Sequence, residues 1–271
     1  MEDISKLAVI GAGKMGETLI KALLDAKILA ADQIVATVKH ANRLEEVAAR
    51  LGVRVLLDNG EAIQSAEVIL LCVKPQALRE TLAEIKPVIR NEQLVISIAA
   101  SATTSFLERH LEKSVPVVRS MPNTPALVRA GMTALCRGAD ATEEHLNRAR
   151  CIFEAVGRTL VIDEKYFDAV TALSASGPAY IYIILESLAE GGVKVGLPRN
   201  VATELAAQMC FGAAQMVLET GAHPALLKDA VTTPAGCTID GILQLEEGGL
   251  RVTLIKAVVE ATRRAAQLIE S

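Results

Sequence analysis

The cysteines of this chain lack the spacing of a disulfide framework or a zinc site. They number five and are scattered as Cys72, Cys136, Cys151, Cys210 and Cys237, with no CxxC pair. Regularly spaced, paired cysteines are typical of small secreted domains and of structural zinc sites. The pattern therefore predicts no metal site and a reducing, cytoplasmic setting.

The chain also has little that would favour nucleic acid or a membrane. Its net charge is -4, and it contains no basic run with interleaved aromatic residues. The longest uncharged run, residues 169–185, is interrupted by Gly177-Pro178 and is shorter than the ~20 residues of a spanning helix. Acidic Glu2 and Asp3 argue against a signal peptide. We therefore expect no nucleic-acid partner and no membrane association.

What the chain does contain is enough apolar sequence, 51% of 271 residues, to bury a sizeable core. Short β-rich runs alternate with helical patterns up to about residue 162, which indicates a doubly wound, Rossmann-like α/β fold. The last three strands share only one long helical stretch, residues 142–156, so we expect antiparallel strands at that end of the sheet. The expected strands are residues 7–10, 33–37, 53–57, 68–73, 94–98, 116–119, 132–136 and 158–162.

After residue 163 the pattern becomes helical throughout. We therefore expect a Rossmann-like domain in residues 1–163 and an all-helical domain in residues 164–271. Residues 180–185 and 205–211 are apolar on more than one face, and a helix of that kind must be buried. A bundle of about 105 residues cannot bury several such helices by itself. The sequence therefore predicts a homodimer joined through the helical domain.

A glycine-rich loop follows the first expected strand directly, reading Gly11-Ala12-Gly13-Lys14-Met15-Gly16. In a dinucleotide-binding loop the three glycines allow a tight turn, close approach of a phosphate, and packing of helix on strand, in that order. A helix beginning at Glu17 would direct its N-terminus at the pyrophosphate. The alternative is a glycine-rich turn that binds no ligand.

The residues after the second strand decide between NAD and NADP. No acidic residue lies between Asp32 and Glu45, where an NAD enzyme carries an acid for the ribose 2′-hydroxyl. Thr37, Lys39 and Arg43 instead offer one hydroxyl and two cations to a 2′-phosphate. The sequence therefore predicts NADP, with solvated surface charges as the alternative for the two cations.

Three further segments fall at the carboxyl edge of the expected sheet, where ligands bind in this architecture. Lys74 precedes the helix-starting Pro75, and either lines the cofactor cleft or only rims the loop. Residues 97–101 are small enough to admit a flat ring. Residues 121–125 form a stiff polar turn suited to fixing a nicotinamide.

Two segments of the helical domain are unusually polar. Residues 173–180 combine small hydroxyl residues with a Gly-Pro pair, which permits either a ligand or close helix packing. Residues 231–238, Val-Thr-Thr-Pro-Ala-Gly-Cys-Thr, precede a helix expected to begin at Ile239. Their hydroxyls and free backbone N–H groups would suit a carboxylate. A simple capped turn is the alternative.

Over its whole length the chain resembles pyrroline-5-carboxylate reductases, which catalyse the last step of proline biosynthesis. The most specific match is the segment ending at Thr238, in which Ala235 and Cys237 stand where Gly and a small residue such as Ala are expected. Cys237 also adds a thiol that is open to oxidation. The residues that carry the resemblance are 11–16, 73–75, 121–125, 174–180, 191–198 and 223–238.

The resemblance implies that NAD(P)H, with NADPH preferred, delivers hydride to C5 of 1-pyrroline-5-carboxylate and gives L-proline. The substrate would lie between the two domains of a dimer. A protonated imine accepts hydride without a catalytic histidine, which suits four histidines in no triad or metal spacing. Gly236, Cys237 and Thr238, with Ser176, are expected to bind substrate, and Thr238 with Thr233 to contact its ring nitrogen or carboxylate.

The same match places Asn59 at the adenosine ribose or phosphate, and Ala99 and Asn123 near the nicotinamide. The family also commonly assembles five dimers into a decamer. One rival is a β-hydroxyacid dehydrogenase, but that class needs a lysine in the first long helix after the sheet, and residues 166–190 contain none. The other rival is an NADP-binding protein without catalytic activity.

Overall fold

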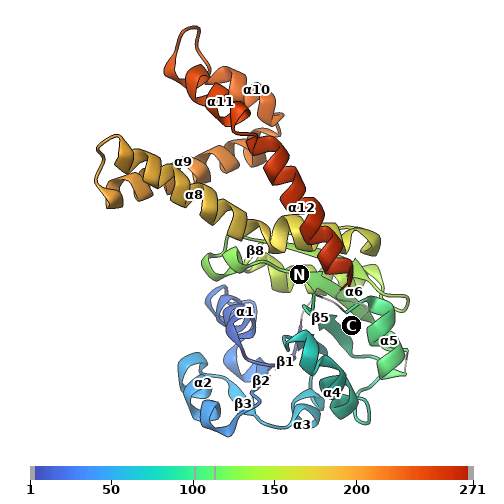
Figure 1. Ribbon diagram of the computed structural model, residues 1–271. Coiled ribbons are helices and arrows are strands. Elements are labelled where there is room, and N and C mark those ends of the chain that lie inside the picture. The colour runs from blue at the N-terminus through green and yellow to red at the C-terminus, as the bar shows by residue number, and fades with distance from the viewer. Residues whose placement is uncertain (1–3, 101, 113, 268–271) are drawn as a thin grey trace. The chain divides into compact units, whose positions relative to one another are not determined.

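The computed structural model describes residues 4–100, 102–112 and 114–267 (Figure 1). Glu2, Asp3 and Ser101, on which parts of the expectations above depend, lie outside them. The chain divides into two compact units, residues 1–175 with 261–271 and residues 176–260. The expected boundary after residue 163 therefore stays a prediction, because the division by contacts falls twelve residues later (175 against 163).

The first unit is built on an eight-stranded sheet of order β3-β2-β1-β4-β5-β6-β7-β8. The strands β1 to β6 are parallel, and their order reverses between β1 and β4, as in Rossmann folds. The strand β7 runs antiparallel to β6, and β8 runs parallel to β7, which confirms the expected antiparallel end. All eight expected strands form, with ends within two residues of expectation: β1 Leu7–Ile10, β2 Ile34–Thr37, β3 Arg54–Leu56, β4 Val68–Leu71, β5 Leu94–Ser97, β6 Val117–Met121, β7 Gly131–Arg137 and β8 Gly157–Val161.

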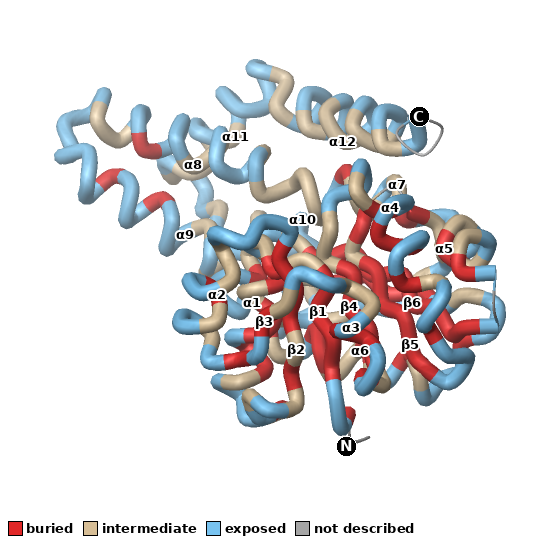
Figure 2. Tube along the Cα trace, turned by 90° about the horizontal axis from the view of Figure 1, so that it is seen from below, coloured by how far each residue is buried: buried red, intermediate tan, exposed pale blue. Residues whose placement is uncertain are grey.

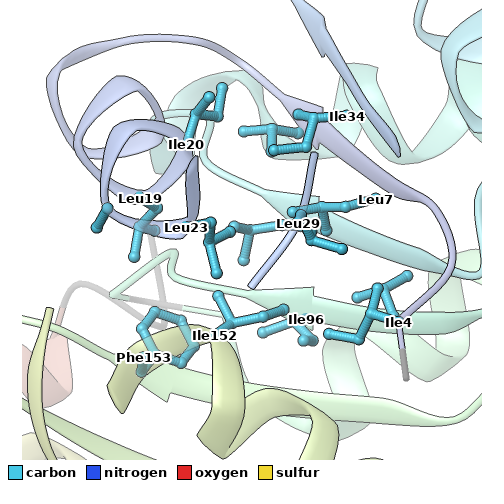
Figure 3. Packing of buried hydrophobic residues seen from close by; sticks show 14 of the residues in the cluster. Ile4, Leu7, Leu19, Ile20, Leu23, Leu29, Ile34, Ile96, Ile152 and Phe153 are labelled. Atoms are coloured by element: carbon cyan, nitrogen blue, oxygen red, sulfur yellow. The ribbon is translucent and has the colours of Figure 1, made fainter. Parts of the chain in front are cut away.

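Helices cover both faces of this sheet because alternate strand residues point to opposite faces. Leu7 and Val9 pack with α1 (Lys14–Asp25), α2 (Leu44–Leu51) and α6 (Glu143–Glu154). Figure 3 shows part of this layer, with Leu19 and Leu23 of α1 near Phe153 of α6. On the other face, Ala8 and Ile10 pack with α3 (Asn59–Ile63), α4 (Pro75–Ile85) and α5 (Thr104–Leu111). The carboxyl ends of the strands are thereby held between two apolar layers.

A short helical segment links the sheet to the second unit. It comprises the 3-10 turn η4 (Glu164–Tyr166), α7 (Phe167–Val170) and the π-helix η5 (Thr171–Ala175). Phe167 and Ala172 are fully buried, and Phe167 packs with Met121 of β6 and Cys136 of β7. This segment therefore belongs to the core of the sheet domain. A 3-10 turn, η3 (Thr124–Val128), follows β6.

The second unit is helical, as expected. Its helices are α8 (Gly177–Lys194), α9 (Arg199–Thr220), α10 (Pro224–Ala230), α11 (Cys237–Glu247) and the start of α12 (Leu250–Gln267). Gly192 of α8 lets Ala202 of α9 approach so closely that a Cβ at Gly192 would lie 2.9 Å from that of Ala202. These two helices pack through small residues.

The helices of this unit bury little of their apolar surface within one chain. Figure 2 shows red, buried residues concentrated in the strands, whereas α8, α9 and α12 are mostly pale blue and tan. Among the described residues of 176–260, only Ala189, Ala202 and Ala206 are buried hydrophobics. Tyr182 and Phe211 are 61% and 59% exposed. Exposure of this kind is typical of an interface between subunits.

Two helical stretches of the described chain are long and apolar enough to cross a membrane, judged by length and composition alone. They are Glu164–Lys194 and Arg199–Thr220, and few of their residues are buried. The first stretch is longer than the uncharged run of residues 169–185, because the Gly177-Pro178 pair lies in the first turn of α8 and does not end the helical stretch. Proline is tolerated in the first turn of a helix.

Candidate active site and cofactor loop

The glycine loop has the geometry of a phosphate-binding turn. Gly11 adopts φ +92°, and a Cβ there would lie 2.9 Å from Cγ1 of Val73. A Cβ at Gly16 would lie 2.7 Å from the carbonyl oxygen of Gly11, so only glycine lets α1 pack this closely. A Cβ at Gly13 would meet no heavy atom of the described chain within 4 Å, its immediate chain neighbours aside. Gly13 therefore leaves open space at the backbone, as approach by a phosphate requires.

The helix behind this loop begins earlier than expected. It starts at Lys14, not at Glu17, because Gly13 closes the turn by donating to the Gly11 carbonyl at 2.8 Å and serves as the N-cap residue. No side chain of the described chain caps this end. The first N–H groups of a helix lack intrahelical acceptors. Those of Lys14, Met15 and Gly16 are therefore available to an anion, and the residues fit a dinucleotide pyrophosphate.

Thr37 supports the loop from the end of β2. Its side chain is only 2% exposed, and its hydroxyl accepts from the N–H of Gly11 at 3.1 Å. Its carbonyl accepts from Ala12 N–H at 2.7 Å. Thr37 therefore supports the loop, and its expected contact with a 2′-phosphate stays a prediction.

The cations near β2 are each paired with a carboxylate. Lys39 lies 3.5 Å from Glu80, and both side chains are largely exposed. Arg43 donates to Oε1 of Glu17 at 2.6 Å, while Arg50 contacts Oε2 of the same carboxylate at 2.8 Å. Glu17 lies in the first turn of α1, so it links the cofactor loop to Arg43. Sequence alone gives no signal for these ion pairs of Glu17, since only the fold brings the three side chains together.

Asn59 and Lys74 both lie at the carboxyl edge of the sheet, at the starts of helices. Asn59 begins α3 and donates to Glu84 of α4. Lys74 is the exposed N-cap residue of α4, with Pro75 in the first turn, which confirms the expected helix start. A ribose or phosphate ligand would compete with Glu84 for the Asn59 amide.

Ala99 and Asn123 follow the neighbouring strands β5 and β6. Ala99 is buried, and its N–H donates to Ser97 Oγ at 3.2 Å. The amide of Asn123 accepts from Met132 N–H at 2.9 Å and donates to the carbonyl of Ser174 at 3.2 Å. Asn123 therefore fastens the polar turn of residues 121–125 to β7 and to the π-helix.

The expected substrate segment forms a tight turn in the second unit. Gly236 N–H donates to the Thr233 carbonyl at 3.0 Å, and Ala235 lies between them at φ +56°. A positive φ at the third position of a turn favours glycine, which explains the expectation of glycine at residue 235. A Cβ at Gly236 would collide with Thr233 Oγ1, so a side chain at residue 236 would force the Thr233 hydroxyl to move.

The helix after this turn begins at Cys237, which corrects the expected start at Ile239. Gly236 is its N-cap residue and no described side chain caps it, so Cys237 and Thr238 occupy the first turn. Their N–H groups are therefore among those without an intrahelical acceptor. Ser176 lies at the N-cap of α8. Thr233 and Gly236 thus lie in the tight turn, and Cys237 and Thr238 in the first turn of the helix that follows it directly.

Burial controls the chemistry of two cysteines. It raises the pKa of Cys72, beside the glycine loop, to about 12. It also raises the pKa of Cys136 to about 12, with a further contribution from the Glu164 carboxylate. These thiols stay protonated and unreactive at neutral pH. Among the described residues, no cluster of three or more His, Cys, Asp or Glu side chains could hold a metal ion.

Comparison with known proteins gives relatives that match nearly the whole chain. A family model described as pyrroline-5-carboxylate reductase dimerisation matches residues 164–268. A second, described as NADP oxidoreductase coenzyme F420-dependent, matches residues 6–101. The chain is 44% identical to the pyrroline-5-carboxylate reductase of Methanosarcina acetivorans over 97% of each chain. It is 40% identical to that of Pisum sativum over 99% of this chain and 97% of the other.

Solved structures of the same family have a similar fold. A pyrroline-5-carboxylate reductase from Coxiella burnetii superposes with a TM-score of 0.91 at 35% identity, covering 98% of both chains. The Plasmodium falciparum pyrroline carboxylate reductase, solved with NADP bound, gives a TM-score of 0.88 at 30% identity and covers 99% of both chains. The similarity therefore includes the glycine loop and the helical unit alike.

Proposed function

The chain belongs to the pyrroline-5-carboxylate reductase family and is an oxidoreductase, and we propose that it reduces 1-pyrroline-5-carboxylate to L-proline with NADPH as the preferred hydride donor. The observation that carries the chemistry is the open approach to Gly13 at the N-terminus of α1. It supplies backbone donors to a pyrophosphate without a side chain in the way. When bound there, the dinucleotide supplies the hydride.

Residues of the helical unit hold the substrate in this proposal. The N–H groups of Cys237 and Thr238, at the uncapped start of α11, bind the substrate carboxylate. The hydroxyls of Thr238 and Thr233 hold the ring nitrogen or carboxylate, and Ser176 contributes a further hydroxyl. The carbon of an imine protonated on nitrogen is already electrophilic, so these residues contribute mainly orientation. Correct orientation lowers the reaction barrier by ~7–11 kcal/mol.

The preference for NADPH depends on Lys39 and Arg43. No acidic residue at the end of β2 would repel the 2′-phosphate, since none lies between Asp32 and Glu45. The Lys39–Glu80 pair is exposed and 3.5 Å long, so a doubly charged 2′-phosphate displaces Glu80 easily. Glu17 holds Arg43 in position without burying it.

The assembly is proposed to be a homodimer in which a second copy covers α8 and α9. The match to a dimerisation family model supports the dimer, and the exposure of Tyr182 and Phe211 supports the surface. Assembly of five dimers and a cytoplasmic setting, in which the free cysteines stay reduced, are further proposals. Light scattering in buffer without detergent tests the state of assembly. A dimer or decamer is expected, whereas aggregation that only detergent relieves would favour a membrane protein.

The activity is tested by following NADPH oxidation with 1-pyrroline-5-carboxylate, beside NADH and beside the six-membered piperideine carboxylate. Rapid turnover with the five-membered imine and faster turnover with NADPH are expected. Thr238→Ala should lower kcat/KM, whereas Thr159→Ala, which removes an exposed hydroxyl bonded to Glu154, should not. Tight NADPH binding with no imine reduced would instead indicate an NADP-binding protein without this activity.

A further inference from the structure

The largest fully buried side chain of the sheet domain is a cation. Arg119 lies in the middle of β6 and is 1% exposed. An ionised group so far from water is destabilising unless neighbouring groups compensate it. Its Nε has no hydrogen-bond partner among the described residues, so the compensation is incomplete. A buried charge retained under such conditions calls for an explanation beyond packing.

The partners of Arg119 come from two segments far apart in the sequence, one after β5 and one after β8. Nη2 donates to the carbonyl of Ala100 at 2.8 Å, and Nη1 donates to Glu164 at 3.1 Å. The guanidinium also lies 4.5 Å from the centre of the Phe167 ring, a cation–π contact. Arg119 therefore joins the loop after β5 to the helical segment after β8.

Glu164 extends the connection to the start of α5. Its Oε1 accepts from the backbone N–H of Thr104 at 2.8 Å, and its Oε2 accepts from the Thr104 hydroxyl at 2.8 Å. Thr104 is the first residue of α5, and a carboxylate is favourable at that end of a helix. In the described part of the β5–α5 loop, residues 98–100 and 102–103, Ala100 is thus held by Arg119. Thr104, which begins the helix after the loop, is held by Glu164.

This loop contains the residue expected to lie beside the nicotinamide. Arg119 pairs in register with Ser97, the last residue of β5, and Ala99 follows two residues later. The loop lies on the β4-β5-β6 side of the reversal in strand order, across from the half that carries the glycine loop and β2. Its backbone can therefore form one wall for the reacting ring.

We propose that Arg119 and Glu164 are positioning residues for hydride transfer, which fix the β5–α5 loop and through it the nicotinamide ring, while the adenosine half is held independently by the glycine loop and β2. This inference rests on the proposed function. Loss of the pair lowers kcat and leaves recognition of the adenosine half intact.

The test compares Arg119→Met, which keeps the volume and removes the donors, with Glu164→Gln. The matched control is Arg148→Met on α6, since Arg148 also pairs with a glutamate and has a buried, unpartnered Nε. We expect a fall in kcat of ~100-fold for Arg119→Met, the scale for a misplacement of ~1 Å. The isotope effect with C4-deuterated NADPH should rise, because hydride transfer becomes rate-limiting.

Affinity for 2′,5′-ADP, a probe of the adenosine half alone, should stay within ~2-fold of the wild type. Glu164→Gln should also lower kcat and leave 2′,5′-ADP affinity unchanged, with a smaller effect on kcat. It provides the test if Arg119→Met does not fold. A kcat unchanged in either folded variant would overturn the proposal. So would a parallel loss of kcat, 2′,5′-ADP affinity and Tm, which a purely structural role produces.

A second readout separates this inference from the proposed function. Bound NADPH fluoresces according to the surroundings of its reduced nicotinamide, whatever the substrate. If the wild type reduces no imine, the proposed function fails, yet Arg119→Met should still change the emission of bound NADPH and Arg148→Met should not. Identical emission in wild type and Arg119→Met, at equal occupancy, would contradict the positioning role.

Discussion

The hydroxyl of Thr37 accepts a hydrogen bond from the backbone N–H of Gly11 at 3.1 Å, joining the end of β2 to the first residue of the cofactor loop. The carbonyl of Thr37 accepts from Ala12 as well. Because Gly11 is held at φ +92°, the loop depends on these external bonds to keep its shape. Thr37 thus holds the backbone of the cofactor loop at Gly11 and Ala12.

Thr37→Val should therefore destabilise the protein by about 1–3 kcal/mol, because it leaves the Gly11 N–H buried without an acceptor. Thr37→Ser keeps the hydroxyl and should cost less. Urea denaturation followed by circular dichroism gives both values. A valine variant as stable as the serine variant would show that water replaces the hydroxyl.

The glycines of the loop should separate binding from stability. Gly13→Ala meets open space and has a compatible φ of -89°, so we expect a change in stability under about 1 kcal/mol. The methyl group occupies the phosphate approach, so the Kd for NADPH should rise at least ~10-fold. Gly16→Ala collides with the Gly11 carbonyl and should lower both stability and affinity. Calorimetry and thermal melts distinguish them; unaltered NADPH affinity in Gly13→Ala would be inconsistent with the assigned site.

Lys39 and Glu80 should tune the cofactor preference in opposite directions. Glu80→Gln removes the competitor for Lys39 and should raise the NADPH-to-NADH ratio of kcat/KM by ~3-fold, whereas Lys39→Ala should lower it by ~10-fold. Arg54→Ala breaks a similar exposed pair with Glu61 and should leave the ratio unchanged. Equal ratios in all three variants would remove Lys39 from the binding site.

Ala235→Gly should stabilise the substrate turn. A residue with a Cβ at φ +56° carries a strain of about 1 kcal/mol that glycine lacks. The net gain should be below that, since glycine loses more entropy on folding. Ala48→Gly in the interior of α2 provides the contrast and should destabilise by up to about 1 kcal/mol. Denaturation midpoints compare them, and destabilisation by Ala235→Gly would exclude strain at this position.

The thiols of half-buried Cys72 and buried Cys136 should make stability fall in alkali. Their pKa, raised by burial to about 12 in the folded state, exceeds the ordinary value of 9.0 expected after unfolding. Below about pH 9 both states keep the proton; between about 9 and 12 only the unfolded state loses it, so the free energy of unfolding falls with pH. Cys72→Ala should reduce that slope by up to about 1.4 kcal/mol per pH unit. Equal slopes in wild type and variant would contradict the burial of a neutral thiol.

Much of the fold follows from local patterns. The alternation of strands and helices was predictable because burial imposes a period on each element. The sheet's antiparallel end was predictable because the last three strands share only one long helical stretch. Helix starts were less so. The helices α1 and α11 begin at Lys14 and Cys237, earlier than expected, because glycine N-caps leave no apolar signal at the first turn.

The site was predictable where residues adjacent in sequence act together, as in the glycine loop. It was not where distant residues meet. Glu17 pairs with an arginine 26 residues away, and Arg119 with a glutamate 45 residues away. The support that Thr37 gives to the glycine loop was not predictable either, because sequence gives its chemistry but not its hydrogen-bond partners. Only tertiary structure supplies these relations.

Hydride transfer to the imine carbon is tested most directly with NADPH deuterated at both C4 positions and 1-pyrroline-5-carboxylate, followed by mass and NMR analysis of the product. We predict L-proline carrying one deuterium at C5 for each NADPH oxidised. Proline without deuterium, or oxidation of NADPH without proline, would contradict it.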